Sequence, residues 1–156
     1  MKKEQTTPIY IAFATNKNHV FESKHFGDAE LYHIYTWDSS KFSFSHTIKN
    51  SLTDFEETDN HGNKKKGLKI RDELQKHNVQ IIVSKQFGTN ITIINYSFIP
   101  IIISDNTIDK ACKTLKKYMN WLCEELADKK EYHKLFIIRN GILKKNILKQ
   151  PYSYPT

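Results

Sequence analysis

The chain has few cysteines, whose disulfide bonds stabilise small secreted proteins, and few glycines and prolines. Its 156 residues include only 2 cysteines, 5 glycines and 4 prolines. Cys112 and Cys123 lie 11 positions apart in a segment with helical periodicity, which would separate them by about 16 Å along one helix. At that distance they can neither form a disulfide bond with each other nor bind the same metal ion. We therefore expect both cysteines to serve core packing.

Long apolar stretches are also absent. No segment approaches the roughly 20 consecutive apolar residues that a membrane-spanning helix requires. The N-terminal sequence MKKEQTTP runs into a short strand-like block and has no apolar region or cleavage site typical of a secretory signal. We expect a cytoplasmic protein without a membrane partner.

Several common catalytic motifs are missing as well. The sequence has no glycine-rich phosphate-binding loop, no G-x-S-x-G, no H-E-x-x-H and no C-x-x-C. A two-metal nuclease would place a carboxylate on its central strand, and the apolar segment IYIAFAT has none. Since no nucleophile and base can be paired either, we predict that the protein is not an enzyme.

The net charge of +7 is confined to one part of the chain. Residues 1–109 carry 13 basic and 13 acidic side chains, and the other 11 basic and 4 acidic side chains all follow residue 109. A basic stretch limited to one helix and a tail is more typical of a solvated surface than of a nucleic-acid groove. Nucleic acid is therefore an unfavoured partner, although it remains the alternative.

The first half of the chain predicts three strands and a helix. The apolar run 8–15 is typical of a strand buried on both faces. Segments 29–38 and 41–49 predict an antiparallel hairpin around the turn residues Asp38, Ser39 and Ser40. Segment 50–66 is polar without a sustained period and predicts a loop with exposed lysines. A one-faced helix over 67–78 then leads into a buried strand over 79–84.

In the second half of the chain the patterns for helices and strands are less consistent. The β-branched run 91–94 favours a strand, while Gly88 before it and Pro100 after it allow a short helix and a strand over 101–104. Helical spacing of apolar residues predicts one helix over 106–130, with Asn106 as N-cap. Asn140 and Gly141, between two apolar runs, predict a hairpin turn. The last six residues, PYSYPT, predict a loosely ordered end.

Seven histidines are the remaining candidates for chemistry: His19, His25, His33, His46, His61, His77 and His133. His33 and His46 alternate with apolar residues in predicted strands, which indicates structural roles. His77 lies near a helix end, where an imidazole is favourable for the helix dipole. His25 differs because it lies in a loop, next to Phe26 and Gly27, at a junction of strands where α/β sheets bind ligands.

The order of these segments resembles a known family. The sequence IAFAT, then HFGDAELYHIYTWD, KFSF, a helix, VQIIVSKQFGTNI, FIPIII and TIDKACKTL is similar to the dinitrogenase iron–molybdenum cofactor biosynthesis family, of the NifX and NifB C-terminal type, over about residues 8–120. The resemblance implies an α/β fold of three α/β/α layers with a mixed sheet. Such a fold is ribonuclease-H-like and nitrogenase accessory factor-like, without nuclease carboxylates. It also implies a helix over 89–96, a domain over 1–127 and a basic extension over 128–156 with a possible hairpin.

The resemblance further implies non-enzymatic binding or carrying of an iron–sulfur or iron–molybdenum-type cofactor, or its precursor, as cargo. The metal ligand would be His25, with Phe26 and Gly27 shaping its loop and Lys24 and Gly88 beside the cofactor. Lys17 and Lys85 are further candidates to offset the cargo's negative charge. The partners would be the cluster and a protein that donates or accepts it. The alternative is an interaction or nucleic-acid-binding module that uses the basic C-terminal third.

These elements predict one sheet. Strand 9–15 should be central, with the 29–49 hairpin on one side and strands 79–84 and 101–104 on the other. A right-handed crossover through helix 67–78 would make the later strands parallel to the first. An all-antiparallel sheet, or a strand at 91–94, would contradict the family resemblance.

Overall fold

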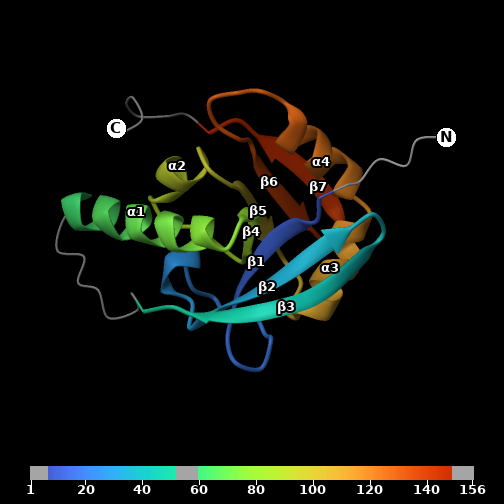
Figure 1. Ribbon diagram of the computed structural model, residues 1–156, viewed down its shortest axis with the longest axis horizontal. Helices are drawn as coiled ribbons and strands as arrows, with labels where there is room; N and C mark the ends of the chain where they lie inside the picture. The colour runs from blue at the N-terminus through green and yellow to red at the C-terminus, as the bar shows by residue number, and fades with distance from the viewer. Residues whose placement is uncertain (1–6, 52–59, 149–156) are drawn as a thin grey trace.

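The computed structural model describes residues 7–51 and 60–148, and it has one seven-stranded mixed sheet with helices on both faces (Figure 1). The strands follow the order β3-β2-β1-β4-β5-β6-β7. Their bounds are β1 Ile9–Thr15, β2 Leu31–Asp38, β3 Lys41–Lys49, β4 Val79–Ser84, β5 Ile99–Ile103, β6 Leu135–Arg139 and β7 Ile142–Asn146. The helices are η1 Phe26–Asp28, α1 Asn60–Lys76, α2 Ile91–Ile94, α3 Ile108–Lys116 and α4 Met119–Ala127.

Strand β1 lies where the sequence predicts it. It pairs antiparallel with β2, which in turn pairs antiparallel with β3. On its other side β1 is parallel to β4, β4 to β5 and β5 to β6. The expected mixed sheet is therefore confirmed.

The two faces of the sheet bury different residues of the same strands. Ile11 and Phe13 of β1 pack with the apolar sides of α3 and α4. Ala12 and Ala14 point to the opposite face, where α1 and α2 cover them. Because alternate residues of a strand face opposite ways, a strand with both faces covered buries apolar residues on both of them. The three layers of the predicted α/β/α fold follow from this alternation.

Helix α1 begins earlier than predicted, and this corrects the interpretation of residues 60–66 as part of a loop with exposed lysines. The stretch 52–59 of the segment interpreted as a loop lies outside the described residues. The helix starts at Asn60, and Lys66 is only 2% exposed. Lys66 lies four residues before Ile70, which lies four before Leu74, so the three share one face of the helix. The aliphatic part of Lys66 thus extends the buried stripe, which a count of apolar residues alone misses.

The β-branched run 91–94 forms helix α2, as the family resemblance implies and as strand propensity does not. Ile93 and Ile94 are both 3% exposed, so burial of these side chains outweighs their intrinsic preference for strands. Strand β5 begins at Ile99, two residues before the predicted start. Pro100 is tolerated because the pairing with β6 starts only at Ile101.

The single helix predicted over 106–130 is wrong, because the chain forms two helices that meet at Tyr118. Tyr118 has φ −117° and ψ 6°, and its hydroxyl donates to the carbonyl of Gly141 in the turn after β6. This contact joins the break between α3 and α4 to the β6–β7 turn. The predicted N-cap is also wrong: the Thr107 side chain accepts from the Lys110 backbone N–H at 3.3 Å. The Asn106 carbonyl instead accepts from the Phe21 backbone N–H at 2.9 Å.

The hairpin predicted at Asn140 and Gly141 is confirmed, with β6 and β7 antiparallel on either side of the turn. Both turn residues have positive φ, 53° and 78°, as a two-residue hairpin turn requires. Strand β6 extends the sheet and buries Phe136 and Ile138 to 1% exposure. The boundary after residue 127 stays a prediction, and the predicted loose end lies outside the described residues.

Candidate functional site

The His-Phe-Gly loop lies at the carboxyl ends of β1 and β4. The backbone N–H of Phe26 donates to the carbonyl of Gln86 at 3.0 Å, and His25 and Gln86 form a parallel β-bridge. The loop is therefore fastened to the segment that follows β4. In open α/β sheets ligands bind outside the carboxyl ends of the strands.

Phe26 anchors the loop in the core. Its side chain is 2% exposed and lies against the rings of Tyr32 and Phe87, with centroid distances of 4.9 and 5.4 Å. Burial of such a side chain stabilises the fold by about 1.5–3 kcal/mol. Phe26 thus fixes the position of His25 beside it.

Tyr32 and Asn50 hold the carbonyl groups of the same loop. The Tyr32 hydroxyl donates to the carbonyl of Phe26 at 2.8 Å. The Asn50 amide donates to the carbonyls of Gly27 at 2.9 Å and Ala29 at 2.8 Å. Burial, and the nearby charge of Asp28, raise the pKa of Tyr32, so its phenol remains a hydrogen-bond donor. Sequence analysis missed both residues, because alternation places Tyr32 on a buried face but gives no sign of its partner.

His25 is exposed, and its ring lies over Gly88. A Cβ atom built on Gly88 would lie 2.9 Å from His25 Nδ1 and 3.4 Å from Cε1. Real Cβ atoms do not approach other atoms so closely, so the ring position depends on the missing side chain of residue 88. The structure in this way brings together two residues that are 63 positions apart in the sequence.

A cavity of about 250 Å³ lies beside this ring. Its lining consists of His25, Phe26, Gly27, Asp28, Lys66, Phe87, Gly88, Thr89, Asn90, Ile91 and Ile94. Four of the five site residues expected from the sequence are therefore neighbours.

The predicted charged residues lie elsewhere. Lys24 does not line the cavity, and its Nζ lies 3.8 Å from the Glu22 carboxylate at the surface. Lys17 is exposed, and Lys85 donates to the side-chain oxygen of Asn106. None of these three lysines lines the cavity.

Lys66 is the lysine that the structure brings to the cavity. Its Nζ lies 2.6 Å from Asp28 Oδ1, and its side chain is 3% exposed against 49% for Asp28. A buried ammonium requires such a partner, because an unpaired buried charge is strongly destabilising. Sequence analysis missed Lys66 because it lies in the segment interpreted as a loop.

Gly27 has a different role from the one that its place in a turn suggests. Among the described glycines, only Gly141 has positive φ, so the Gly27 backbone needs no special freedom. A Cβ at Gly27 would lie 3.2 Å from Ile70 Cδ1 and 3.8 Å from Lys66 Cε. The missing side chain therefore lets the loop pack closely against α1.

Within residues 7–51 and 60–148, no group of three or more His, Cys, Asp or Glu side chains is placed to hold a metal ion. The two cysteines are half-buried and free, on α3 and α4. Burial, reinforced by the nearby Asp109 charge, raises the pKa of Cys112 to about 12, and burial raises that of Cys123. Since cysteine binds metals as the thiolate and not as the thiol, neither cysteine is a ready ligand.

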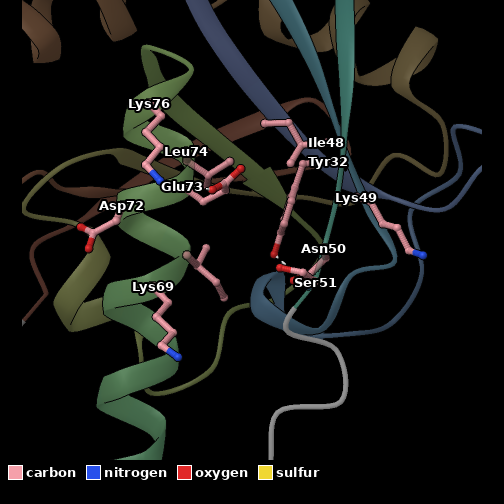
Figure 2. A pocket seen from close by; sticks show the side chains of 11 residues that line it. Tyr32, Ile48, Lys49, Asn50, Ser51, Lys69, Asp72, Glu73, Leu74 and Lys76 are labelled. Carbon is pink, nitrogen blue, oxygen red and sulfur yellow. Dashed lines mark hydrogen bonds and ion pairs between the residues drawn. The ribbon is translucent and has the colours of Figure 1, made fainter.

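A second cavity, of about 320 Å³, lies between α1 and the β2–β3 strands (Figure 2). Lys69 and Asp72 of α1 and Lys49 of β3 are among the polar residues around it. Tyr32 and Asn50 lie on its strand side, joined by an amide-to-hydroxyl hydrogen bond of 3.3 Å. The pair that holds the His-Phe-Gly loop therefore also lines this second cavity.

Fold and loop together define an α/β domain in which the His-Phe-Gly loop presents the exposed His25 at the carboxyl edge of the sheet. The sequence model of the family described as "Dinitrogenase iron-molybdenum cofactor" matches residues 7–118, which is more than half of the chain. The chain belongs to this family, as the resemblance indicates. A search of curated proteins gives no match.

The family match covers β1 through α3 and ends at Tyr118, where α3 and α4 meet. It includes all five site residues expected from the sequence. In the described part of the chain, no helix has both the length and the apolar character needed to cross a membrane.

Proposed function

We propose that this protein binds and carries an iron–sulfur cofactor of the iron–molybdenum type, or its precursor, and that His25 is the protein ligand to iron. The family match supports the class of cargo. The observation that carries the residue assignment is the exposed His25 ring, held over Gly88 at the rim of a cavity. A cluster several ångströms across needs such an accessible ligand.

The chemistry of one imidazole suits a carrier. Imidazole nitrogen is a good ligand for iron, and one protein ligand leaves the other iron and sulfide atoms of the cargo accessible. A single bond also permits transfer to a protein that accepts the cofactor. The function needs no catalytic step, and cytoplasmic donor or acceptor proteins are the partners that it requires.

The charges that line the cavity are balanced, so the iron–nitrogen bond should supply most of the binding energy. Lys66 faces Asp28, so this pair adds little net charge beside the cargo. Lys24, exposed next to His25 in the sequence, is the residue that we propose for attraction of an anionic cluster. Such an exposed charge would act mainly at low ionic strength.

Anaerobic titration of the full chain with an isolated iron–sulfur cofactor or precursor, followed by absorption and electron paramagnetic resonance (EPR), tests this function. We expect saturable binding by the wild type and loss of binding by His25→Ala. His19→Ala is the matched control, because His19 is also exposed in a loop but does not line the cavity. Equal binding by the wild type and His25→Ala would contradict the assignment.

A second candidate is an interaction or nucleic-acid-binding module. It is favoured by the exposed Trp121, 49% accessible, whose ring lies 4.6 Å from Lys145 Nζ. An exposed aromatic ring beside basic residues is one way to bind bases and phosphates. Salt-dependent binding to single-stranded DNA or RNA would support this function, and no binding at low ionic strength would exclude it.

A further inference from the structure

Two histidines face each other on the α1 side of the sheet, away from the His25 loop. His46 lies on β3 and His77 immediately follows α1. His46 Nε2 is 2.8 Å from His77 Nδ1, and both side chains are half-buried. The two rings therefore join the strand to the carboxyl end of the helix through nitrogen atoms that are aimed at each other.

The outer nitrogen of each ring also has a polar neighbour. Ser45 Oγ lies 2.8 Å from His46 Nδ1, and Glu73 Oε1 lies 3.7 Å from His77 Nε2. The Glu73 carboxylate favours a proton on His77 Nε2, which leaves His77 Nδ1 as a lone pair. His46 Nε2–H then donates to His77 Nδ1, and the Ser45 hydroxyl donates to His46 Nδ1. One proton therefore lies between the two facing nitrogens.

We propose that His46 and His77 bind a divalent transition-metal ion such as Zn²⁺ in place of this proton. Zinc–imidazole bonds of about 2.0–2.1 Å in a tetrahedral arrangement place two nitrogens about 3.3 Å apart. The observed 2.8 Å separation must widen by only about half an ångström to reach that value. Because the two nitrogens now point at each other, each of the two partly exposed rings must also turn by roughly 35° so that both lone pairs converge on one tetrahedral ion.

The outer partners suit the metal-bound state. When the metal occupies both facing nitrogens, His46 Nδ1–H can donate to Ser45 and His77 Nε2–H to Glu73. Metal-binding histidines usually donate their second N–H to a carboxylate or another oxygen, which fixes the ring and raises its basicity. Ser45 and Glu73 are thus positioning residues rather than ligands.

The neighbouring charges and the open coordination positions determine how tightly this site should bind a metal ion. Burial, and then the charge of His77, lower the pKa of His46. Lys76 Nζ lies 3.9 Å from Glu73 Oε2 and offsets part of the favourable negative charge. Water must complete the coordination of a two-histidine site, so we expect micromolar rather than nanomolar affinity.

This site shares no residue with the His25 cavity, so the two proposals can fail separately. The test is calorimetric titration of the full chain with Zn²⁺ near pH 7.5. We expect one ion per chain, and at least tenfold weaker binding by His46→Ala and by His77→Ala. His19→Ala is the control and should bind as the wild type does. Unchanged affinity in both pair variants, or a comparable loss in His19→Ala, would overturn the proposal.

Three additions keep the test decisive if a variant folds poorly. His46→Gln and His77→Gln keep a polar side chain, and circular dichroism checks the fold of each. Glu73→Gln keeps both ligands but weakens the orienting partner, so we expect about tenfold weaker binding. Co²⁺ bound to the wild type should show nitrogen and oxygen ligation, whereas a thiolate charge-transfer band would place the metal on a cysteine and contradict the assignment.

Discussion

The His-Phe-Gly loop and the β2–β3 hairpin both carry histidines, but they present them in opposite ways. In the hairpin, His33 is 3% exposed, with its Nδ1 2.7 Å from Thr15 Oγ1 and its ring 3.9 Å from that of His19. His46 contacts His77. In the loop, the backbone is held by buried neighbours while the His25 ring stays exposed.

The difference separates two uses of imidazole. His33 forms part of the packed structure, and burial, with the nearby His19, lowers its pKa to about 4. In the loop, Phe26, Tyr32 and Asn50 hold the backbone, so the histidine itself need not contribute to stability. In the loop, we therefore expect substitutions of the buried neighbours to change stability and substitution of His25 to change cofactor binding. In the hairpin, we expect substitution of a histidine to change the packed structure itself.

The largest expected effect is on the anchor of the loop. Phe26→Ala should lower the free energy of unfolding by about 3–4 kcal/mol, because it leaves a cavity between Tyr32 and Phe87. Urea unfolding measures this change. Phe44→Ala, at a side chain that is 52% exposed, is the control and should change the value much less. Equal effects of the two variants would mean that Phe26 does not anchor the loop.

The hairpin should be sensitive to acid. The pKa of His33 in the folded protein, about 4, lies below its unfolded value near 6.5, so protonation favours the unfolded chain. Stability is complete above pH 6.5 and should fall by on the order of 2–3 kcal/mol as the pH drops towards 4. Urea unfolding at several pH values measures this slope. His33→Asn should flatten it, and an unchanged slope in that variant would assign the acid sensitivity to other groups.

A smaller loss is expected at the residues that hold the loop carbonyls. Asn50→Ala removes the amide that donates to Gly27 and Ala29 and should cost about 1–3 kcal/mol. Tyr32→Phe removes the hydroxyl that donates to Phe26 and should cost less, since the ring remains. Hydrogen exchange of the loop amides should become faster in Asn50→Ala. Unchanged exchange there would show that the backbone is held by other contacts.

The smallest effect on stability is expected at Gly88, where cargo binding should nevertheless change. Gly88→Ala places a Cβ where His25 Nδ1 now lies, and the flexible ring can move away, so unfolding should change by less than about 1 kcal/mol. Binding of the cofactor should weaken because the ring is displaced. Gly141→Ala is the control: its φ of 78° makes alanine strained there, yet it lies far from the loop in the sheet order. Weaker binding by Gly141→Ala than by Gly88→Ala would contradict the role of residue 88.

The sequence predicts the framework better than the cavity. The apolar run of β1, the β2–β3 hairpin and the Asn140–Gly141 turn are determined by local patterns and are correct. The errors occur where distant parts of the chain meet: the break between α3 and α4 lies at Tyr118, whose hydroxyl contacts Gly141, and the buried Lys66 pairs with Asp28. Local periodicity contains no information on these pairs. Helix α2 follows from the family resemblance, because its isoleucines alone indicate a strand.

The same limit applies to the cavity. Its lining combines the loop after β1, Lys66 of α1 and the segment from the end of β4 into α2. The sequence motif identifies His25 and its neighbours, and the family pattern adds Gly88. The contribution of Lys66 and the absence of Lys24 from the lining depend on how α1 packs, which only the three-dimensional structure shows.

The central claim is that the His25 imidazole binds iron, and pulsed EPR on protein with ¹⁵N-labelled histidine tests it most directly. The full chain, loaded anaerobically with a paramagnetic iron–sulfur cofactor or precursor, should show a hyperfine coupling from one histidine nitrogen. We predict that this coupling disappears in His25→Ala and persists in His19→Ala. A loaded protein that shows no histidine coupling, or one that keeps it in His25→Ala, would contradict the account.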